Sequence, residues 1–571
     1  MFEKFEKAVL NGIQSSAQRR FILIGTLLGF ILSVMMIAPT KMVLAKMLPG
    51  KNNDTFTVYI DLPNGSSIQQ TKQVSDCVVG FVQKEKEVLD TEVFLGMGSP
   101  LDFAGLIKGS HFKNSENVAE VVLNLTKKHH REEPSYMMVQ RMRPMINQTC
   151  SQIFPNTKIS FVEPPAGPPV LAAVVAEIYG YDADGIRKLA NRVSGVLEST
   201  KGLVDVDIMQ DDIYDTYEII VNTEKTSRSG VSVKQLNDIL YLAFEGMDIA
   251  VKNSDVYSDQ IPIYLSLSKE SKKFSSKDIN AVKAKLAALK LMNKMGMMTP
   301  LTELVTVVPK KSNPMILSKN LYQMTSVMAE TDMVSQVYPL MEARNVILDT
   351  FSDDFEIKKI GLFNLELTDK LSGSTYKLIW DGEMEVTLDT FVELGAAFIA
   401  ALVLIFLLMV IYYKSYTLSG IILLGSFLSI IGVIVGHWIM DIFTTDTFFL
   451  TATSLIGFIA LIGISSRNSL LLIDFTKSLM DEKGMHKAEA IAYATSTRAK
   501  PIFLTAAAII LASTLLAGDA VFGGLGVALI FGTVAAVVSS LIIVPVLLYI
   551  ADLEKHFHFH EKKAVSINEP L

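Results

Sequence analysis

Charged side chains are scarce in this chain of 571 residues. Asp, Glu, Lys and Arg together make up 19% of it, whereas hydrophobic residues make up 50%. Soluble domains contain about 25% charged residues, so this composition is unusual for a soluble protein. The net charge of −7 does not indicate a nucleic-acid partner, because proteins that bind nucleic acids present basic surfaces. The composition therefore favours a membrane protein.

The chain also lacks the short motifs of common hydrolases, nucleotide-binding proteins and zinc proteins. It contains no nucleophile elbow, no phosphate-binding loop and no zinc-ligand spacing. We therefore expect no enzyme activity, no cofactor and no metal centre. Cysteine is rare as well. The two cysteines, Cys77 and Cys150, leave two alternatives open: a disulfide, which an oxidising compartment would allow, or two buried helical thiols.

Six apolar runs are long enough to cross a membrane, because a hydrocarbon core about 30 Å thick requires about 20 residues of helix. The runs are 21–39, 391–412, 418–440, 448–474, 501–517 and 523–550. The first run is too long for the apolar region of a signal peptide, and no A-x-A-like cleavage site follows it. We therefore expect a cytoplasmic segment at 1–20, a retained membrane anchor at 21–39 and five further spans within 391–550.

The orientation follows from Lys and Arg in the short loops, which favour the cytoplasmic side. The basic residues of the two terminal segments and of the short loops are Lys4, Lys7, Arg19, Arg20, Lys414, Lys477, Lys483, Lys487, Arg498, Lys500, Lys555, Lys562 and Lys563. All of them fall on one side when six spans are counted, and the opposite loops at 441–446 and 518–519 contain no Lys or Arg. Both termini, including the tail 551–571, are therefore predicted to be cytoplasmic. A cytoplasmic amphipathic helix is expected near 477–497.

Residues 40–165 form the first part of the external segment and alternate between strand and helix patterns. The predicted strands are 55–62, 91–98, 118–126 and 157–164, and the predicted helices are 63–85 and 137–153. The order strand, helix, strand, strand, helix, strand is that of a split βαβ or ferredoxin-like unit. Pro144 is expected to kink the second helix.

A second unit of the same kind begins after the proline-rich linker 163–169. Its first half is predicted at 166–210, and its remaining elements follow only in 312–390. The residues between them, 211–311, are predicted to form an inserted mixed α/β subdomain. The predicted fold is therefore a membrane α-helical domain of six transmembrane helices with a large α+β external region. That region contains two βαββαβ subdomains, of which the second carries the insertion.

One segment places an arginine where a membrane helix is expected. LIGISSRNSLLLIDF (461–475) contains Arg467 inside the fourth apolar run. An arginine at the centre of a membrane helix costs between about 2.5 and 17 kcal/mol, so it normally faces protein and has a partner. The nearest acid along the segment is Asp474. It lies seven residues on, which is about 10 Å along a helix axis and awkward for a direct pair. The partner of Arg467 is therefore expected elsewhere.

Several segments resemble, in matching order, the resistance–nodulation–division (RND) transporters, and in particular their drug-efflux branch. TATSLIGFIALIGISSRNSLLLIDF (451–475) is similar to the family's tenth membrane helix, with its pattern G-x-x-x-[KR]-N-x-[IL]-L-L-x-[DE]-F. Residues 497–518 and 524–550 resemble the eleventh and twelfth helices. DLPNGSSIQQT, EPPAGPP and EKTSRSGVSVKQLNDIL resemble external porter and docking segments. The resemblance covers the whole chain but only the C-terminal half of a typical member, which has twelve spans.

The resemblance implies a proton antiporter whose coupling site is completed by a second polypeptide. In the family, two Asp residues on the fourth helix carry the proton, in a motif like G-x-x-V-D-D-A-I, and this chain contains no such motif. The implied partner of Arg467 is therefore an acid on an N-terminal-half subunit. Protonation of that acid would weaken its pairing with Arg467 and shift the packing of the helices.

The resemblance to the RND family implies five proton-coupling candidates in this chain. Arg467 occupies the position of the family's usual Lys, Asn468 and Asp474 complete the motif, Thr505 matches a hydroxyl of the eleventh helix, and Arg498 matches the first Arg of an R-x-R-P pattern. Each has a structural alternative. Arg467 could form a packing pair, Asn468 an interhelical hydrogen bond and Thr505 a bond to its own i−4 carbonyl. Asp474 and Arg498 could be interfacial.

Two aromatic residues are candidates for substrate binding. Phe94 resembles an aromatic residue that lines the family's porter pocket, and Phe103 resembles the Phe of a loop that separates two pockets. Ordinary core or loop aromatics are the alternative. The methionine-rich segments 137–145 and 291–298 raise a different possibility, because thioethers are soft ligands for Cu(I) or Ag(I), as in the metal-exporting branch. Methionine also fills gaps in cores.

By resemblance, the chain is expected in the bacterial inner membrane with its large loop in the periplasm. It would export hydrophobic or amphiphilic compounds from the periplasm or the inner membrane. The expected partners are the N-terminal-half subunit with the Asp pair, further copies in a three-fold assembly, a periplasmic adaptor, an outer-membrane channel and membrane lipids. The alternatives are a Cu(I)- or Ag(I)-exporting subunit, a non-transporting accessory or scaffold protein, and a homo-oligomer, in which Arg467 would face Arg467.

Overall fold

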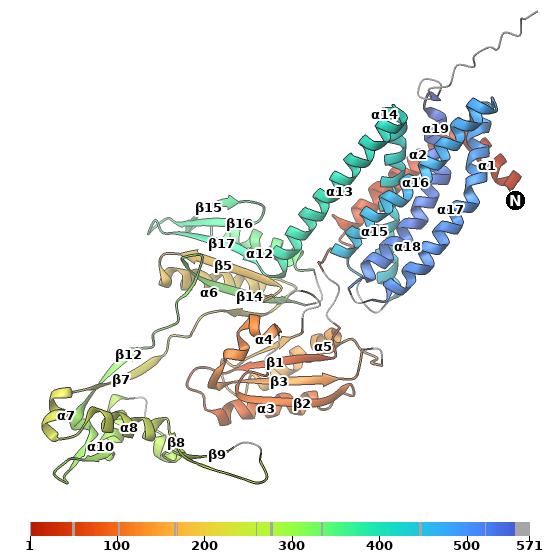
Figure 1. Ribbon diagram of the computed structural model, residues 1–571. Helices are drawn as coiled ribbons and strands as arrows, with labels where there is room; N and C mark the ends of the chain where they lie inside the picture. Colours follow the sequence, from red (N-terminus) through yellow and green to blue (C-terminus); the bar gives the residue numbers. More distant parts are fainter. Residues whose placement is uncertain are drawn as a thin grey trace, which may run out of the picture. The chain divides into compact units, whose positions relative to one another are not determined.

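The computed structural model describes residues 2–47, 52–100, 103–128, 130–164, 167, 170–257, 260–274, 278–332, 335–444, 448–519 and 521–553. It divides into two compact units, Met1–Met209 with Ile316–Leu571, and Gln210–Met315 (Figure 1). Part of the linker 163–169 and the expected cytoplasmic tail beyond Leu553, with its three lysines, lie outside the described residues.

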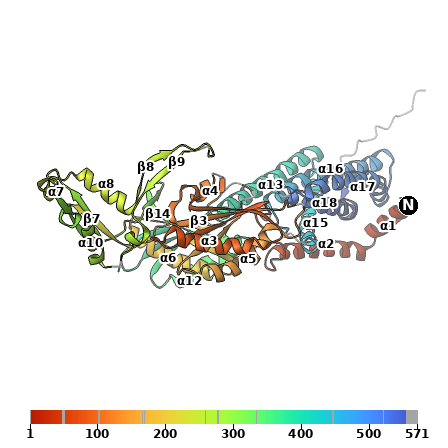
Figure 2. The ribbon, with the colours of Figure 1, turned by 90° about the horizontal axis from the view of Figure 1, so that it is seen from below.

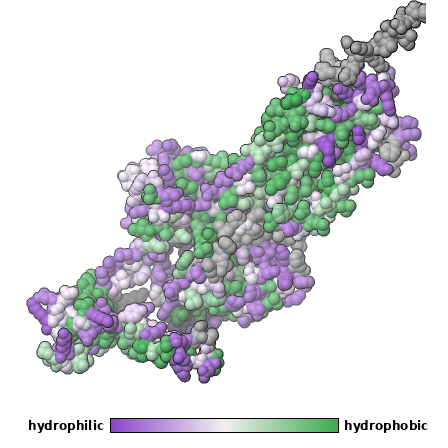
Figure 3. Space-filling model, in the orientation of Figure 1, coloured by the Kyte–Doolittle hydropathy of each residue, from purple (hydrophilic) through white to green (hydrophobic). Residues whose placement is uncertain are grey.

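Six helical segments in the described part of the chain are long and apolar enough to cross a membrane. They are α2 (Ser16–Ile37), α13 (Glu383–Tyr413), α14 (Tyr416–Phe427) with α15 (Ser429–Phe443), α16 (Ala452–Glu482), α17 (Lys487–Ala517), and α18 (Gly523–Val538) with the π-helical turn η2 (Ser539–Ile543) and α19 (Val544–Ile550). A further helix, α1 (Phe2–Gln14), precedes α2. Figure 3 shows hydrophobic side chains over the surface of α13 and its neighbours, which suits contact with lipid.

The helix boundaries differ from the sequence expectation in two places. The amphipathic helix expected near 477–497 is not a separate element, because α16 continues to Glu482 and α17 starts at Lys487 and runs through Pro501. The apolar run 418–440 consists of two helices that meet at Leu428. Hydropathy marks where the hydrocarbon ends, whereas backbone hydrogen bonding continues a helix into the interface beyond it.

Residues 55–162 form a two-layer α/β sandwich, called here the first sandwich. It is built around a four-stranded antiparallel sheet in the order β2-β3-β1-β4. Its elements are β1 (Thr55–Asp61), α3 (Ile68–Val82), β2 (Val88–Met97), α4 (Phe103–Lys108), η1 (Ser110–Phe112), β3 (Asn114–Leu125), α5 (Ser135–Cys150) and β4 (Lys158–Val162). Ser67 and Gln70 form a capping box that starts α3. Figure 2 shows α3 and α5 on one side of the sheet and α4 on the other.

The second sandwich contains seven strands in the order β13-β14-β5-β17-β16-β15, with β6 paired to β14. Its elements are β5 (Val174–Gly180), α6 (Ala183–Ser199), β6 (Leu203–Ile208), β13 (Leu317–Lys319), β14 (Tyr322–Thr331), α12 (Val337–Thr350), β15 (Phe355–Ile360), β16 (Asn364–Asp369) and β17 (Thr375–Asp381). Residues 355–369 form the β15–β16 hairpin, in which Gly361 has a φ of +58° and turns the chain. Asp182 caps α6 through its side chain.

The two sandwiches meet through ion pairs and have separate hydrophobic cores. Arg143 on α5 donates to Asp205 on β6 at 3.1 Å, and Lys108 on α4 donates to Glu330 on β14 at 3.0 Å. Burial raises the pKa of the Asp205 carboxyl, and the Arg143 charge opposes that shift. In both ion pairs, the basic residue belongs to the first sandwich and the acidic residue belongs to the second.

The second unit has a small core of its own around Leu236, Leu286 and Leu301. Its elements are β7 (Asp215–Val221), α7 (Thr223–Ser229), α8 (Val233–Phe244), β8 (Met247–Lys252), β9 (Ile261–Leu265), α9 (Lys269–Lys272), α10 (Ile279–Ala288), β10 (Lys290–Met292), β11 (Met298–Pro300), α11 (Leu301–Leu304) and β12 (Val305–Lys311). The strands pair as β7 with β12, β8 with β9 and β10 with β11, all antiparallel.

Cys77 and Cys150 form a disulfide, which decides between the two alternatives that the sequence left open. It joins α3 to α5, and Cys150 belongs to the core of the first sandwich. The bond closes a loop with a sequence separation of 73 residues. In the chain-entropy account, a loop of this length restricts the unfolded chain enough to stabilise the fold by about 4 kcal/mol.

Replacing both cysteines by serine should destabilise the first sandwich by about 2–5 kcal/mol. Amide hydrogen exchange of α3 and α5 measures this loss directly, without requiring the other parts of the chain to unfold. Adding a reductant to the wild-type protein should reproduce the loss, whereas the double variant should not respond to the reductant. If reduced wild-type protein, in which both thiols can be titrated, exchanges as slowly as the oxidised protein, the disulfide does not stabilise the sandwich.

Candidate functional site

Helix α16 carries the arginine that the sequence singles out. Thr451 and Ser454 form the capping box that starts the helix. One side of α16 is buried and rich in small and hydroxyl residues, and it packs against α14, α17 and α18. Small residues let membrane helices approach closely. The packing of α16 within this chain is therefore made by the face that does not carry Arg467.

Arg467 lies on the opposite, exposed stripe of α16. The stripe repeats every three or four residues, as one face of a helix does, and consists of Ile456, Ala460, Gly463, Arg467 and Leu471. Among the described residues, the Arg467 side chain makes no hydrogen bond and no ion pair. A single charge thus sits in an otherwise uncharged strip of a membrane helix.

Asn468 points into the chain rather than along the stripe of Arg467. It is buried next to a group of serines, among which Ser466 on α16 and Ser426 on α14 have their hydroxyls 2.9 Å apart. The Ser465 and Ser469 hydroxyls are buried without a hydrogen-bond partner among the described residues. Successive helical residues differ by about 100° in direction, so Asn468 belongs to the interhelical packing and not to the exposed charge.

Asp474 is held by two tyrosines at the end of α13. The Tyr413 hydroxyl donates to Asp474 at 2.7 Å and the Tyr412 hydroxyl at 3.3 Å. Arg467 is not among the partners of Asp474, as the spacing along the helix predicts. The acid therefore joins α13 to α16 within the chain and leaves the charge of Arg467 uncompensated.

The two candidates on α17 have local partners. The Thr505 hydroxyl donates to the carbonyl of Pro501, one turn earlier, at 2.9 Å. The Arg498 guanidinium lies 5.1 Å from the centre of the Phe475 ring, and its Nε has no hydrogen-bond partner among the described residues. Neither residue contacts Arg467 through a hydrogen bond or an ion pair in the described part of the chain. The structure therefore does not assemble the five candidates into one cluster.

The two aromatic candidates lie in the first sandwich. Phe94 is half-buried in β2 and is the direct cross-strand neighbour of Glu120 in β3. Phe103 begins α4, and its side chain lies outside the described part of the structure.

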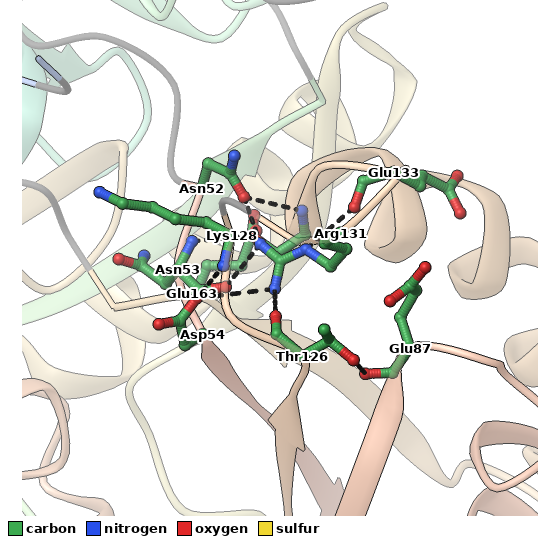
Figure 4. A network of polar contacts seen from close by, with 10 residues as sticks. Asn52, Asn53, Asp54, Glu87, Thr126, Lys128, Arg131, Glu133 and Glu163 are labelled. Carbon is green, nitrogen blue, oxygen red and sulfur yellow. Dashed lines mark hydrogen bonds and ion pairs between the residues drawn. The ribbon is translucent and has the colours of Figure 1, made fainter. Parts of the chain in front are cut away.

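A polar cluster surrounds Arg131 in the first sandwich, and no motif in the sequence predicts it (Figure 4). The Arg131 side chain is 1% exposed. It donates to the backbone carbonyls of Thr126, Asn53 and Glu133 and to the side chain of Asn52. Burial lowers the pKa of the guanidinium, and the nearby acids Asp54 and Glu87 oppose that shift. The cluster fastens residues 52–54, just ahead of β1, to the sandwich, and we assign it a structural role.

Comparison with known proteins places the whole described chain in one family. The profile of the AcrB/AcrD/AcrF family matches residues 1–552. The swarming motility protein SwrC of Bacillus subtilis is 25% identical over 377 residues, which are 65% of this chain and 32% of that protein. The multidrug export protein AcrF of Escherichia coli is 29% identical over 149 residues, which are 25% of this chain and 14% of that protein.

Metal-resistance proteins appear among the matches as well. The cobalt-zinc-cadmium resistance protein CzcA of Cupriavidus metallidurans is 22% identical over 415 residues, which are 70% of this chain and 35% of that protein. Among solved structures, a heavy metal efflux pump has a TM-score of 0.71 at 18% identity and covers 95% of this chain and 52% of that one. This last likeness is one of fold. The chain spans about a third of SwrC and CzcA and about half of the solved pump.

Replacing Tyr413 by Phe should destabilise the packing of α13 on α16 by about 1–3 kcal/mol, because it leaves a partly buried carboxyl with a weaker partner. Thermal unfolding in detergent measures the effect. Tyr412→Phe is the matched control, since Tyr412 is 61% exposed and Tyr413 is 7% exposed. Its cost should stay within about 0.5 kcal/mol. Equal losses in the two variants would show that the Tyr413 bond does not hold Asp474.

Proposed function

The chain belongs to the AcrB/AcrD/AcrF family of RND permeases, and from this premise we propose that it is the C-terminal-half subunit of a split, proton-driven efflux pump. Its cargo would be hydrophobic or amphiphilic compounds taken from the periplasm or the inner membrane. Its relatives support efflux, since AcrF of Escherichia coli is a multidrug export protein. The order of its helices and its two external sandwiches supports an RND arrangement with ferredoxin-like porter subdomains and an inserted docking subdomain.

The exposed, unpartnered Arg467 is the observation that carries this proposal. A guanidinium facing lipid at membrane depth costs several kcal/mol even on the most lenient scale. The stripe around Arg467 therefore faces protein, and its partner carries a carboxylate. Because Asp474 is engaged by tyrosines, we assign the carboxylate to a separate N-terminal-half subunit with paired intramembrane Asp residues.

The proposed coupling follows from the fixed charge of arginine, which does not deprotonate in proteins. An ionised Asp of the partner would pair with Arg467 and hold α16 in one position. Protonation of that Asp would remove the attraction and shift the population towards a second packing. Arg467 is thus the central residue of the coupling site, and Asn468, Asp474, Arg498 and Thr505 are proposed to support α16 and α17 around it.

The proposed location is the bacterial inner membrane, with both termini cytoplasmic and the two sandwiches in the periplasm. We further propose a three-fold assembly that works with a periplasmic adaptor and an outer-membrane channel. The family premise supports these partners, and the absence of Lys and Arg from the loops 441–446 and 518–519 supports the orientation.

Replacing Arg467 by Ala should abolish proton-driven dye efflux by the complex of this chain with its N-terminal-half partner, while Arg467→Lys should retain part of it. Because Arg467 has no partner among the described residues, Arg467→Ala should change the stability of the isolated chain by less than about 0.5 kcal/mol. Co-purification followed by dye efflux from vesicles with an imposed proton gradient measures the first effect. Arg20→Ala, at an exposed arginine of α2, is the control.

The result of this experiment distinguishes a proton-coupled half-pump from a scaffold protein and from a homo-oligomer. Unchanged efflux in Arg467→Ala would exclude the coupling role. A chain that never co-purifies with an acid-bearing half and shows no efflux would favour a non-transporting scaffold. Efflux by the chain alone would favour a homo-oligomer, although two facing Arg467 charges repel each other.

Exposed methionines favour a second candidate, export of Cu(I) or Ag(I). Met138 and Met142 are buried in a core and cannot reach a metal from outside. Met292, Met295, Met297 and Met298, on the β10–β11 hairpin, are each more than half exposed. Met292 and Met298 are direct cross-strand neighbours, so their thioethers share one face of the hairpin. Thioethers select soft monovalent metals.

Under this second candidate, replacing Met292 and Met298 together by Leu should lower the affinity of the purified chain for Ag(I) by about tenfold or more. Isothermal titration with Ag(I) measures the change. Met315→Leu, at another exposed methionine of the same unit, is the matched control. A titration that the double variant leaves unchanged would remove the structural support for metal export.

A further inference from the structure

The segment that follows α2, residues 41–47, runs beside the start of α16, and we call it the strap. Leu450, just ahead of α16, forms a parallel β-bridge with Ala45 of the strap. The Leu450 N–H donates to the carbonyl of Leu44 at 2.8 Å, and the Leu450 carbonyl accepts from the N–H of Lys46 at 3.1 Å. The strap is therefore fastened through its backbone to the start of α16.

Two side chains of the strap contact different parts of the structure. Val43 is 2% exposed and belongs to one hydrophobic cluster with Phe458 and Leu461 of α16. Lys41 has a φ of +55°, in the left-handed region that residues other than glycine rarely adopt. Its Nζ lies 4.9 Å from the centre of the Tyr338 ring. The strap thus lies against the membrane bundle with Val43 and against α12 of the second sandwich with Lys41.

Tyr338 belongs to the first turn of α12 and also contacts the backbone of the strap. Its hydroxyl accepts a hydrogen bond from the N–H of Ala45. Burial raises the pKa of Tyr338, and this N–H opposes the shift. The bridge to Leu450 uses the groups of Leu44 and Lys46, so the Ala45 N–H is left to face α12. Ala45 therefore connects the start of α16 with the second sandwich.

Gln336, the N-cap residue of α12, makes a corresponding contact with α13. Its Nε2 donates to the Thr387 hydroxyl at 2.7 Å, and both side chains are buried. The Oε1 of the same amide is buried and has no hydrogen-bond partner among the described residues. A buried acceptor without a donor costs free energy. The contact therefore leaves an acceptor available to a donor in a second arrangement of α13.

We propose that the N-terminal end of α12 is the junction at which α13 and α16 act together on the second sandwich, with Tyr338 and Gln336 as its positioning residues. In the proposed efflux function, on which this inference rests, α16 changes its packing when the partner acid is protonated. A displacement of the start of α16 carries the strap with it, because backbone hydrogen bonds join the two, and the strap contacts Tyr338. Helix α13 reaches the same end of α12 through Thr387.

Tyr338→Phe tests the contact with the strap, because it removes the hydroxyl that accepts from Ala45 and keeps the ring beside Lys41. Amide hydrogen exchange at Ala45 in the purified full-length chain should become about fivefold faster. Tyr181→Phe is the matched control, since Tyr181 belongs to the same sandwich but is 81% exposed. It should leave the exchange unchanged. Unchanged exchange in Tyr338→Phe as well would overturn the role of its hydroxyl.

Efflux of rhodamine 6G by the complex of this chain with its N-terminal-half partner tests the junction itself. Tyr338→Phe and Gln336→Met should each lower the maximal rate by about fivefold or more and leave the KM for the dye unchanged. Gln336→Met keeps the length of the side chain and removes its amide. Tyr181→Phe should leave both the rate and the KM unchanged. If Gln336→Met does not fold, Tyr338→Phe alone decides the test.

Other results would overturn the junction. A higher KM with an unchanged maximal rate would assign the two residues to cargo binding. Unchanged efflux together with faster exchange at Ala45 would show that the Tyr338 hydroxyl only holds the fold. A wild-type complex without efflux would count against the proposed efflux function, and the exchange measurement would still decide whether Tyr338 holds the strap.

Discussion

A guanidinium at membrane depth has to meet a counter-charge, and the described residues of this chain do not supply one for Arg467. Helix α16 turns its small and hydroxyl residues towards α14, α17 and α18 and engages Asp474 with Tyr413. These contacts hold the helix without using Arg467. The charge of Arg467 is thereby left on an exposed stripe of α16, which the proposed partner subunit would complement with a carboxylate on a closely packed helix.

Arg131 is an arginine of the same chain whose guanidinium does have hydrogen-bond partners. Arg131 is buried and gives its hydrogen bonds to three backbone carbonyls and to Asn52. Removing it would leave several acceptors unpaired, which is the signature of a structural residue. Arg467 has none of these partners among the described residues. Two residues of identical chemistry therefore differ in their surroundings: Arg131 is buried with four hydrogen bonds, and Arg467 is exposed with none among the described residues.

The sequence predicted features that depend on local periodicity and missed those that depend on distant contacts. The apolar runs and the alternating strands follow from neighbours in the chain, so the six spans and most strands were expected. Glu120 looks like an ordinary outward residue of a half-exposed strand, because its burial comes from the segment between β2 and β3. The Cys77–Cys150 bond depends likewise on how α3 and α5 align. The partners of Asp474 depend on where α13 ends relative to α16.

The membrane site and the external sheet are connected by a short covalent route. β17 lies next to β5 in the second sandwich and leads through Gly382 directly into α13. Gly382 has a φ of +86°, and an added Cβ would stand 2.5 Å from the Ala172 carbonyl oxygen, so this junction admits glycine alone without rearrangement. At its other end, α13 holds Asp474 of α16 through Tyr413. Helix α13 is therefore a continuous link between α16 and the sheet of the second sandwich, so a movement of one of them can reach the other along it.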